Sequence, residues 1–366
     1  MKRYNFSVED NKAFVEKIRS IKQDALKRRI KYGEQQLNQP INFWTKKDRL
    51  LNEIGKEFTI ILRTRGCSWA LGESGGCSMC GYYLDANIED VSATQIINQF
   101  DYAYNDKISE IKQDSNNYIT KIFNSGSFLD EDEIPEKVRK YIYRRIANEE
   151  KIKEFIIESR LEHITSERLE EIREFFDKKY IEIAIGLETV NDYVRNNYIN
   201  KGILFKDFKN VLKRCKEHGL GVKVYLLFKP PFLNEQAAID DCSNSIKTLI
   251  ELNVNSISIN PLNIQRGTLT EYLWFQNRYR PPWFYSLFKC LKKSLTQESL
   301  KNVRLVSDPS GAGTKRGIHN CLERECENSA KKKLKSFVFS QNLRELKHKG
   351  YECTCKIKYI LQKNYY

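Results

Sequence analysis

Short apolar runs alternate with amphipathic segments along most of this chain of 366 residues. Six apolar runs have the length and the β-branched content of buried strands, and they cover residues 58–62, 119–123, 155–157, 181–185, 222–227 and 256–259. Between them, apolar residues recur at three- and four-residue steps, which is typical of amphipathic helices, over residues 93–104, 135–146, 166–176, 205–218 and 235–252. The pattern therefore predicts a regular alternation of strands and helices.

Strands that alternate with helices usually form a parallel sheet joined by right-handed crossovers. We therefore expect an α/β fold, a partial (β/α)6 barrel related to the eight-unit TIM barrel. An open doubly wound sheet has the same local pattern and is the alternative. In barrels of this kind the functional site lies at the C-terminal ends of the strands.

The pattern changes at both ends of the chain and suggests three regions. Residues 1–50 are charged and mostly helical in pattern, and we expect them to form an N-terminal extension. Residues 51–304 contain the alternation and form the predicted barrel. Residues 305–366 contain four cysteines and a lysine run at 331–333. This basic C-terminal segment is therefore a candidate for a metal site and for contact with nucleic acid.

Net charge and cysteine content narrow the range of partners and compartments. Lys and Arg total 62 against 48 Asp and Glu, a formal net charge of +14. This excess favours a polyanion such as nucleic acid, although a basic surface can also serve solubility alone. We find neither an apolar run long enough to cross a membrane nor a signal peptide, so we expect a cytoplasmic protein. Ten cysteines in such a chain suggest metal sites or reduced thiols before disulfides.

Three cysteines, Cys67, Cys77 and Cys80, lie in one glycine-rich stretch directly after the first predicted strand. A closed structural metal site usually has four protein ligands. Three thiolates on a four-iron cluster instead leave one iron open to bind a small molecule. We interpret the triad as the ligand set of a 4Fe-4S cluster. A zinc site with a fourth ligand from elsewhere and a redox-active cysteine pair are the alternatives.

Polar residues also follow the next three strands, at the edge where a barrel carries its site. They are Asn124 to Ser127 after the second strand, Glu158 to Arg160 after the third and Gly186 to Glu188 after the fourth. Each has an ordinary structural explanation, such as a tight turn at Gly186 or a solvated carboxylate at Glu188. Their common position after the strands supports one shared pocket.

The triad and these turns resemble the radical S-adenosylmethionine (radical SAM) superfamily, in a spacing variant similar to its Elp3-like branch. The resemblance implies a radical SAM partial barrel in which a 4Fe-4S cluster on the triad cleaves S-adenosyl-L-methionine to a 5′-deoxyadenosyl radical. It also implies cofactor-binding roles for Ser125, Gly126, Ser127, Glu158, Arg160, Gly186 and Glu188. Met79 stands where the superfamily usually has an aromatic residue, so adenine stacking falls to Tyr82 or to apolar contacts.

The second half of the chain resembles the archaeosine-biosynthesis radical SAM enzyme family, usually called RaSEA. The resemblance rests on the strings at residues 260–269, 280–283, 307–311 and 316–321. It implies an archaeal tRNA-modifying lyase. Such an enzyme cleaves the lysine adduct of the 7-cyano-7-deazaguanine base at position 15 of tRNA by radical C–N bond cleavage, which forms archaeosine. The implied partners are tRNA, the archaeosine synthase that adds the lysine, and an unidentified electron donor.

Two other functions fit parts of the pattern. The first is an Elp3-like or other radical SAM enzyme that modifies a tRNA base, although this chain has no room for an acetyltransferase domain of the Elp3 kind. The second is a non-catalytic, zinc-containing RNA-binding protein. Anaerobic reconstitution with iron and sulfide would separate an enzyme from such a binding protein.

The remaining cysteines form two groups. Cys321, Cys326, Cys353 and Cys355, with His319 nearby, supply four or five soft ligands. Zinc, a second iron–sulfur cluster and thiols without a metal all remain open for them. The other three, Cys215, Cys242 and Cys290, fall on the apolar faces of predicted helices and are expected in the core.

Overall fold

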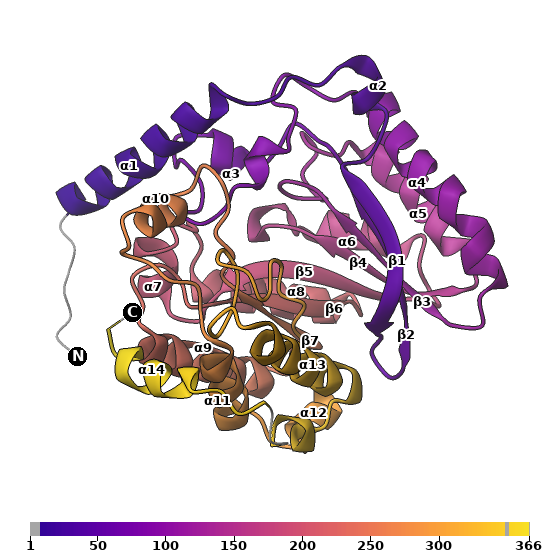
Figure 1. The fold of residues 1–366 in the computed structure, drawn as a ribbon. Coiled ribbons are helices and arrows are strands. Elements are labelled where there is room, and N and C mark those ends of the chain that lie inside the picture. Colours follow the sequence, from indigo (N-terminus) through magenta and orange to yellow (C-terminus); the bar gives the residue numbers. More distant parts are fainter. Residues whose placement is uncertain (1–7, 348–350, 366) are drawn as a thin grey trace.

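The computed structural model describes residues 8–347 and 351–365, and its centre is one curled sheet of eight strands (Figure 1). The strands are β1 Asn42–Arg49, β2 Ile54–Ile61, β3 Tyr118–Phe123, β4 Ile152–Glu158, β5 Tyr180–Glu188, β6 Gly221–Phe228, β7 Ser256–Pro261 and β8 Arg304–Val306. They lie side by side in sequence order, with β1 antiparallel to β2 and the other neighbours parallel. A doubly wound sheet reverses its strand order, so the sequential order confirms the partial barrel.

The six predicted strands correspond to β2 through β7, and the structure adds a strand at each edge of the sheet. The N-terminal extension is helical over α1 (Val8–Leu26) and α2 (Glu34–Leu37), but it then enters the sheet as β1, which we did not predict. Several charged residues of β1 have partners that lie far away in the sequence. Lys46, for example, forms ion pairs with Glu57 on β2 and Asp308 beyond β8.

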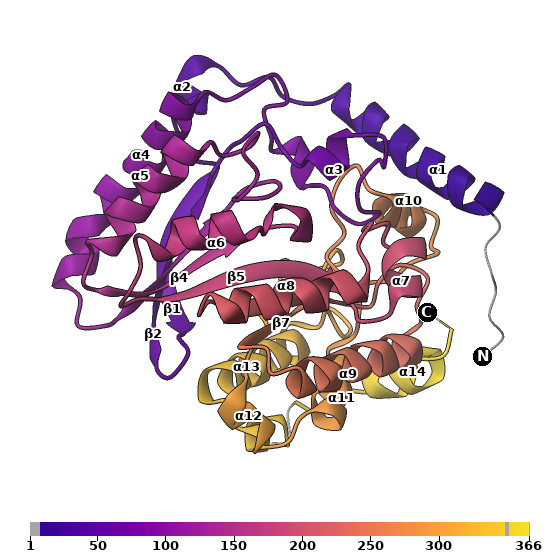
Figure 2. The same cartoon turned by 180° about the vertical axis from the view of Figure 1, so that it is seen from behind.

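Helices cover the outer face of the sheet (Figure 2). They are α4 Ala93–Gln113, α5 Glu136–Ala147, α6 Ser166–Arg173, α8 Phe205–Glu217 and α9 Glu235–Glu251, which agree with the five predicted helices. The main apolar core fills the space between them and the strands, with Phe58, Ile122, Phe155, Ile183 and Val224 all inaccessible to solvent. Cys215, Cys242 and Cys290 are buried, as predicted.

The inner face of the curled sheet is charged, because alternate residues of each strand point away from the helices. Arg304 lies 2.6 Å from carboxylate oxygens of both Glu154 and Glu182, in a fully enclosed triad. Lys121 lies 2.5 Å from carboxylate oxygens of Asp48 and Glu57. Burial of charges on this scale requires pairing, and the pairs supply it. The barrel interior therefore contains paired charges beside a small apolar cluster of Leu50, Ile119, Ile156 and Ala184.

A second apolar cluster joins the N-terminal helix to the cysteine loop. Ile18 on α1 packs with Cys77 and with Leu273 on α10 (Leu269–Phe275). In both views α1, α3 (Ser68–Leu71) and α10 lie together beyond one end of the sheet (Figures 1 and 2). The extension thus covers the loop that carries the triad.

The C-terminal segment returns along the last strands. After the long helix α11 (Phe284–Ser294) and the short α12 (Ser299–Asn302), α13 (Arg324–Ser340) lies beside β1 and β8, and Gln341 bonds to both backbone groups of Leu305. The last helix, α14 (Cys355–Gln362), lies against α9 and α11 (Figure 1). No described helix is long and apolar enough to cross a membrane.

Candidate functional site

The cysteine loop begins where β2 leaves the sheet and curls over the C-terminal edge of the strands. Cys67 caps α3, and Gly75 and Gly76 both have positive φ, at 68° and 72°. Residues with a side chain rarely adopt this conformation, and a Cβ at Gly76 would also collide with Lys22 and with the backbone of Ala70. The two glycines therefore allow the loop to fold back tightly between Cys67 and Cys77.

The segment after β5 holds the loop in place. The Asn200 side chain donates to the carbonyl oxygens of Ser74, at 2.8 Å, and Gly76, at 2.9 Å. The backbone N–H of Ser78 donates to the Ile199 carbonyl at 2.8 Å, and the Trp69 indole donates to the Asn200 carbonyl at 2.8 Å. These bonds fix the loop from both sides, so that the three thiols are positioned before any ligand binds.

The three thiols lie close enough together for their charges to interact. Burial raises the pKa of Cys67, and the neighbouring Cys77 raises it further. Burial also raises the pKa of Cys80 to about 11, although the nearby Lys22 ammonium opposes the shift. Thiols of this kind are protonated at neutral pH and give up their protons when a metal binds.

The buried ammonium group of Lys22 indicates the charge of the ligand that the cysteine loop can bind. This residue on α1 is only 3% exposed, and its ammonium group lacks a hydrogen-bond partner in the described part of the chain. Burying a cation without a counter-charge costs free energy. An anion bound beside Cys80 would offset this cost. A cluster held by three thiolates is negatively charged, and the donor set and the orphaned ammonium both fit it.

The turn after β3 lies directly against the cysteine loop. A Cβ at Gly126 would meet the Cα of Cys67, and the Ser125 hydroxyl donates to the Tyr82 carbonyl at 3.2 Å. Glu133 holds the turn, since its carboxylate accepts from the Ser127 N–H and from the Asn124 side chain, both at 2.8 Å. Burial raises the pKa of Glu133 to about 7. Glu133 was not predicted from the sequence, because it lies six residues beyond Ser127 in an irregular segment.

Residues at the C-terminal ends of β4 and β5 form the opposite side of the site. Gly186 and Glu188 lie within β5 and Glu188 is buried, so neither a tight turn at Gly186 nor a solvated carboxylate at Glu188 is present. Arg160 stacks over Trp69 at 4.8 Å from the ring centre and donates to the Lys201 carbonyl at 3.2 Å. Glu188, which has a φ of 68°, pairs with the Lys201 ammonium at 2.8 Å. Burial alone would lower the pKa of Lys201, but the Glu188 carboxylate raises it above its ordinary value. Any side chain at Gly186 would collide with this pair.

Glu158 connects this rim to the charged interior. Burial raises its pKa to about 7, and Tyr225 forms a hydrogen bond with it. The register aligns Glu158 with Ala184 and Ala184 with Lys223 on β6, so the three residues share one row across the sheet. Burial lowers the pKa of Lys223 to about 8, and Lys121 lowers it further. The polar-apolar alternation within β6, Val-Lys-Val-Tyr, was the signal that could have identified Lys223 and Tyr225.

A cleft of about 700 Å³ opens beside the cysteine loop. Tyr82, which is 54% exposed, lies at its edge, and the cleft is lined on the other side by α1 and α10. Three arginines (Arg28, Arg29 and Arg266) and three acidic residues (Asp24, Asp85 and Glu271) contribute to the lining, together with the aromatic residues Tyr32, Tyr272 and Phe275. The cleft therefore carries charges of both signs and is partly aromatic.

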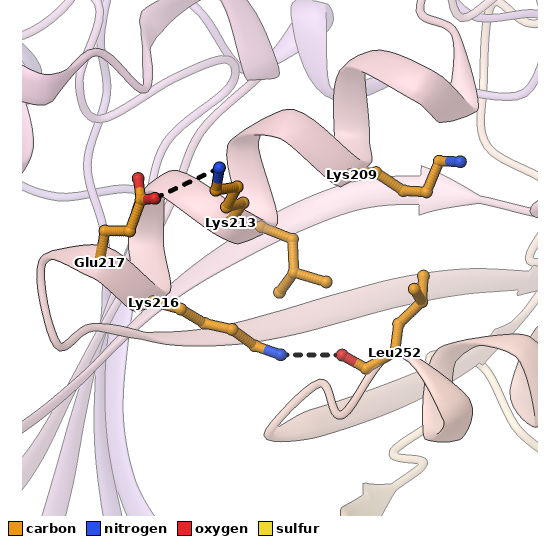
Figure 3. A pocket seen from close by; sticks show the side chains of 6 residues that line it. Lys209, Lys213, Lys216, Glu217 and Leu252 are labelled. Atoms are coloured by element: carbon orange, nitrogen blue, oxygen red, sulfur yellow. Dashed lines mark hydrogen bonds and ion pairs between the residues drawn. The ribbon is translucent and has the colours of Figure 1, made fainter.

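Another depression, of about 490 Å³, lies on the outer surface of α8 (Figure 3). Its lining includes Lys209, Lys213, Lys216 and Leu252, and the Lys216 ammonium donates to the Leu252 carbonyl. The C-terminal ends of α8 and α9 lead into β6 and β7, so this depression lies toward the N-terminal ends of the strands. It is thus opposite the edge that carries the cysteine loop.

The structure brings together four of the five residues suggested as a second metal site. The sulfur atoms of Cys321, Cys326, Cys353 and Cys355 all lie within 4.8 Å of one another. His319 lies outside this group, and its Nδ1 is instead 2.7 Å from the Gly317 carbonyl oxygen. Burial lowers the pKa of His319 to about 4.

The family to which the barrel and its cysteine loop belong can be identified by comparison with known proteins. Residues 61–242 match the radical SAM superfamily model. The fold, the loop and this match define a radical SAM enzyme, whose cofactors are a 4Fe-4S cluster and S-adenosyl-L-methionine.

Curated relatives identify the family more closely. The chain is 35% identical to the archaeosine synthase subunit beta of Methanosarcina acetivorans over 337 residues, which cover 92% of this chain and 94% of the relative. It is 36% identical to the protein of the same name from Thermococcus kodakarensis over 323 residues, 88% of this chain and 97% of the relative. An uncharacterised protein of Methanocaldococcus jannaschii is 37% identical over 357 residues, 96% of this chain and 93% of that protein. The chain therefore belongs to the archaeosine synthase subunit beta family of radical SAM enzymes.

Proposed function

We propose that this enzyme performs the last step of archaeosine formation in tRNA. In this step it cleaves the lysine adduct of the 7-cyano-7-deazaguanine base at position 15 and leaves the amidine of archaeosine. Two relatives named archaeosine synthase subunit beta support the pathway. The observation that carries the chemistry is the thiol triad at the C-terminal edge of the sheet, beside the buried Lys22 ammonium, which has no hydrogen-bond partner among the described residues.

Cys67, Cys77 and Cys80 would hold the cluster. When bound, the cluster and S-adenosyl-L-methionine supply a 5′-deoxyadenosyl radical that removes a hydrogen atom from the substrate. The chain's own contribution is to bind and orient the reactants and to exclude water. Lys22 balances negative charge at the cluster, and α1 covers the loop on its outer side.

The neighbouring strand ends would bind S-adenosyl-L-methionine. The turn from Ser125 to Ser127 touches the cysteine loop, and Glu133 fixes its conformation. Glu158 and Glu188 offer carboxylates of the kind that bind ribose hydroxyls, whereas Arg160 offers a cation for the methionyl carboxylate. Gly186 leaves room for the adenosine beside the Glu188–Lys201 pair, and Tyr82 supplies an aromatic ring at the mouth of the site.

The charged interior suits the lysyl part of the adduct. A lysyl group linked through its side chain carries a free α-carboxylate and a free α-ammonium. Lys223 supplies a buried cation in the same register row as Glu158, and Tyr225 forms a hydrogen bond with Glu158. A complementary pair of charges of this kind would orient the adduct and select against a base that lacks the lysine.

The cleft beside the cysteine loop would bind the tRNA. Arg28 and Arg266 offer charges for phosphates, and Tyr272 and Phe275 offer rings for unpaired bases. A base inside folded tRNA has to be extruded to reach the enclosed thiol site, and the cleft borders that site at Tyr82. The lysine-adding synthase is the proposed protein partner, since it makes the substrate.

The proposal is tested by incubating the reduced, reconstituted enzyme with lysine-adducted tRNA and analysing the digested nucleosides by mass spectrometry. Archaeosine should appear, and it should require both S-adenosyl-L-methionine and a reductant. The Cys77→Ala variant serves as the matched control, because it removes one thiol and leaves the cleft beside the cysteine loop intact. Consumption of S-adenosyl-L-methionine without any change in the adduct would refute the assignment of the substrate.

A further inference from the structure

Four cysteines near the C-terminus converge at a point outside the site described above. They come from two places in the chain: Cys321 and Cys326 flank the start of α13, and Cys353 and Cys355 flank the start of α14. The Cys321 and Cys353 sulfur atoms are 3.7 Å apart, and those of Cys326 and Cys355 are 3.9 Å apart. We propose that these four thiolates bind one zinc ion in a closed tetrahedral site that fastens the C-terminal helix to the barrel.

The sulfur–sulfur distances identify the kind of metal centre. A Zn–S bond of about 2.3 Å in a tetrahedron places neighbouring sulfur atoms about 3.8 Å apart. The two measured pairs agree with this value, and all four atoms fall within 4.8 Å. In an iron–sulfur cubane each thiolate binds a different iron and points outward from the core, which spreads the sulfur atoms more widely. A single ion therefore fits this group, and a second four-iron cluster does not.

The same distances argue against two disulfides. A disulfide requires about 2.05 Å between its sulfur atoms, much less than either pair shows. Four converging thiols of which two, Cys326 and Cys355, are buried have few other uses in a reduced compartment. Four soft thiolates in a tetrahedron favour zinc among the common divalent metals.

The surroundings of the group hold it in this arrangement. One carboxylate oxygen of Glu327, a buried residue on α13, accepts from the backbone N–H groups of Asn320, Cys321 and Leu322 at 2.7, 2.9 and 3.0 Å. These three hydrogen bonds fix the conformation of the loop that contains Cys321. On the opposite side, the Tyr285 hydroxyl is 3.4 Å from the Cys355 sulfur, and the Tyr359 ring packs on Trp283 at 5.7 Å between ring centres.

The position of the group explains what the ion would stabilise. The Ser286 hydroxyl donates to the Tyr359 hydroxyl of α14, and the Gln236 N–H and the Asn234 side chain donate to carbonyl oxygens of Lys363 and Asn364, just beyond α14. Arg280, which stacks on Trp283 at 3.7 Å from the ring centre, donates to the His319 and Asn320 carbonyls next to Cys321. A zinc ion would therefore join α14 to the segment that follows α10, at the rim of the cleft beside the cysteine loop.

The test uses a protein in which the radical site cannot contribute metal. The full chain carrying Cys67→Ala, Cys77→Ala and Cys80→Ala is purified under reducing conditions, and its zinc, iron and acid-labile sulfide are measured. We expect one zinc ion per chain and neither iron nor sulfide. Replacement of zinc by cobalt should give the visible spectrum of a tetrahedral tetrathiolate. Iron with sulfide, disulfides detected by mass, or free thiols without metal would each overturn the proposal.

Variants of the four cysteines then locate the ion. Cys326→Ser together with Cys355→Ser should remove the zinc, whereas Cys215→Ser, at a buried cysteine outside the group, should retain it. Cys321→Ser changes a surface residue and spares the packing, so it should fold and should lose zinc to a chelator faster than the parent protein does. Equal retention in Cys321→Ser and in the parent would contradict the assignment. Because the parent lacks the radical site by design, these results are independent of the proposed archaeosine activity.

Discussion

The ammonium group of Lys22 lies 4.8 Å from the centre of the Tyr83 ring and beside Cys80, where it has a cation–π contact and no hydrogen bond within the described chain. A helix that comes before the barrel in the sequence thus places a buried positive charge at the thiol site. The charge favours the more negative state of any cluster held there, and that is the reduced state.

Replacing Lys22 by Met should make the cluster harder to reduce. The expected shift in reduction potential is on the order of 50 mV toward more negative values, since 59 mV corresponds to a tenfold change for one electron. Iron and sulfide content should stay close to the wild-type values, because the three thiols remain. The measurement is a redox titration followed by electron paramagnetic resonance. Lys12→Met, at an exposed position on the same helix, is the control and should leave the potential unchanged.

The raised pKa of Glu158 predicts a stability that depends on pH. Its folded pKa of about 7 lies above the ordinary value of 4.5, so the folded state binds more protons than the unfolded state between these values. The free energy of unfolding therefore falls as pH rises from about 4.5 to 7. Glu158→Gln should remove this part of the dependence and stabilise the ligand-free protein at pH 8 by about 1–2 kcal/mol.

Denaturant unfolding at pH 4 and at pH 8 checks this prediction. The two proteins should unfold at similar denaturant concentrations at pH 4, where Glu158 is neutral in both the folded and unfolded states. Glu251→Gln, at an exposed position at the end of α9, should change neither value. A loss of stability in Glu158→Gln at pH 8 would show that the carboxylate is stabilised by partners that outweigh its burial.

Sequence reasoning recovered the repeating part of the fold and missed what tertiary structure creates. The six apolar runs became β2 to β7, because a buried parallel strand carries its own apolar signal. In contrast, β1 has the sequence Asn-Phe-Trp-Thr-Lys-Lys-Asp-Arg, and its charges are accommodated only by residues elsewhere, such as Lys121 beside Asp48.

In the site, too, residues with a local sequence signal could be predicted, and residues that act through tertiary contacts could not. The triad, the turn after β3 and the C-terminal ends of β4 and β5 carry local signals, and the structure brings them to one edge of the sheet. Lys22, Glu133 and Lys201 carry none, since each acts through a contact made by folding. The convergence of four C-terminal cysteines on one point, with His319 excluded, likewise required coordinates.

Lys223 should determine affinity for the lysine adduct. Lys223→Met removes the buried cation proposed to bind the α-carboxylate, so KM for lysine-adducted tRNA should rise about tenfold, which corresponds to about 1.4 kcal/mol. In the wild-type enzyme the pKa of this group is about 8, so affinity should fall as pH rises above 8 and the ammonium loses its proton. Lys209→Met on the outer face of α8 is the control (Figure 3). An unchanged KM in Lys223→Met would exclude the proposed contact.

The arginines of the cleft beside the cysteine loop should account for the salt dependence of tRNA binding. Replacing Arg28 and Arg266 together by Ala should weaken binding and reduce the slope of log Kd against log salt by about 2, at roughly one unit for each lost phosphate contact. The matched double variant, Lys213→Ala with Lys216→Ala, removes the same charge from the depression on α8 and should leave the slope unchanged. If both double variants weaken binding equally, net charge and not the cleft determines affinity.

The account depends most directly on the three thiols at the edge of the sheet, and the release of 5′-deoxyadenosine by the reduced protein measures their role. Wild-type enzyme and the Cys326→Ser, Cys355→Ser variant should both form 5′-deoxyadenosine from S-adenosyl-L-methionine, whereas Cys77→Ala should form none and still bind tRNA with nearly wild-type affinity. Continued formation of 5′-deoxyadenosine by Cys77→Ala would contradict the assignment of the triad as the cluster ligands.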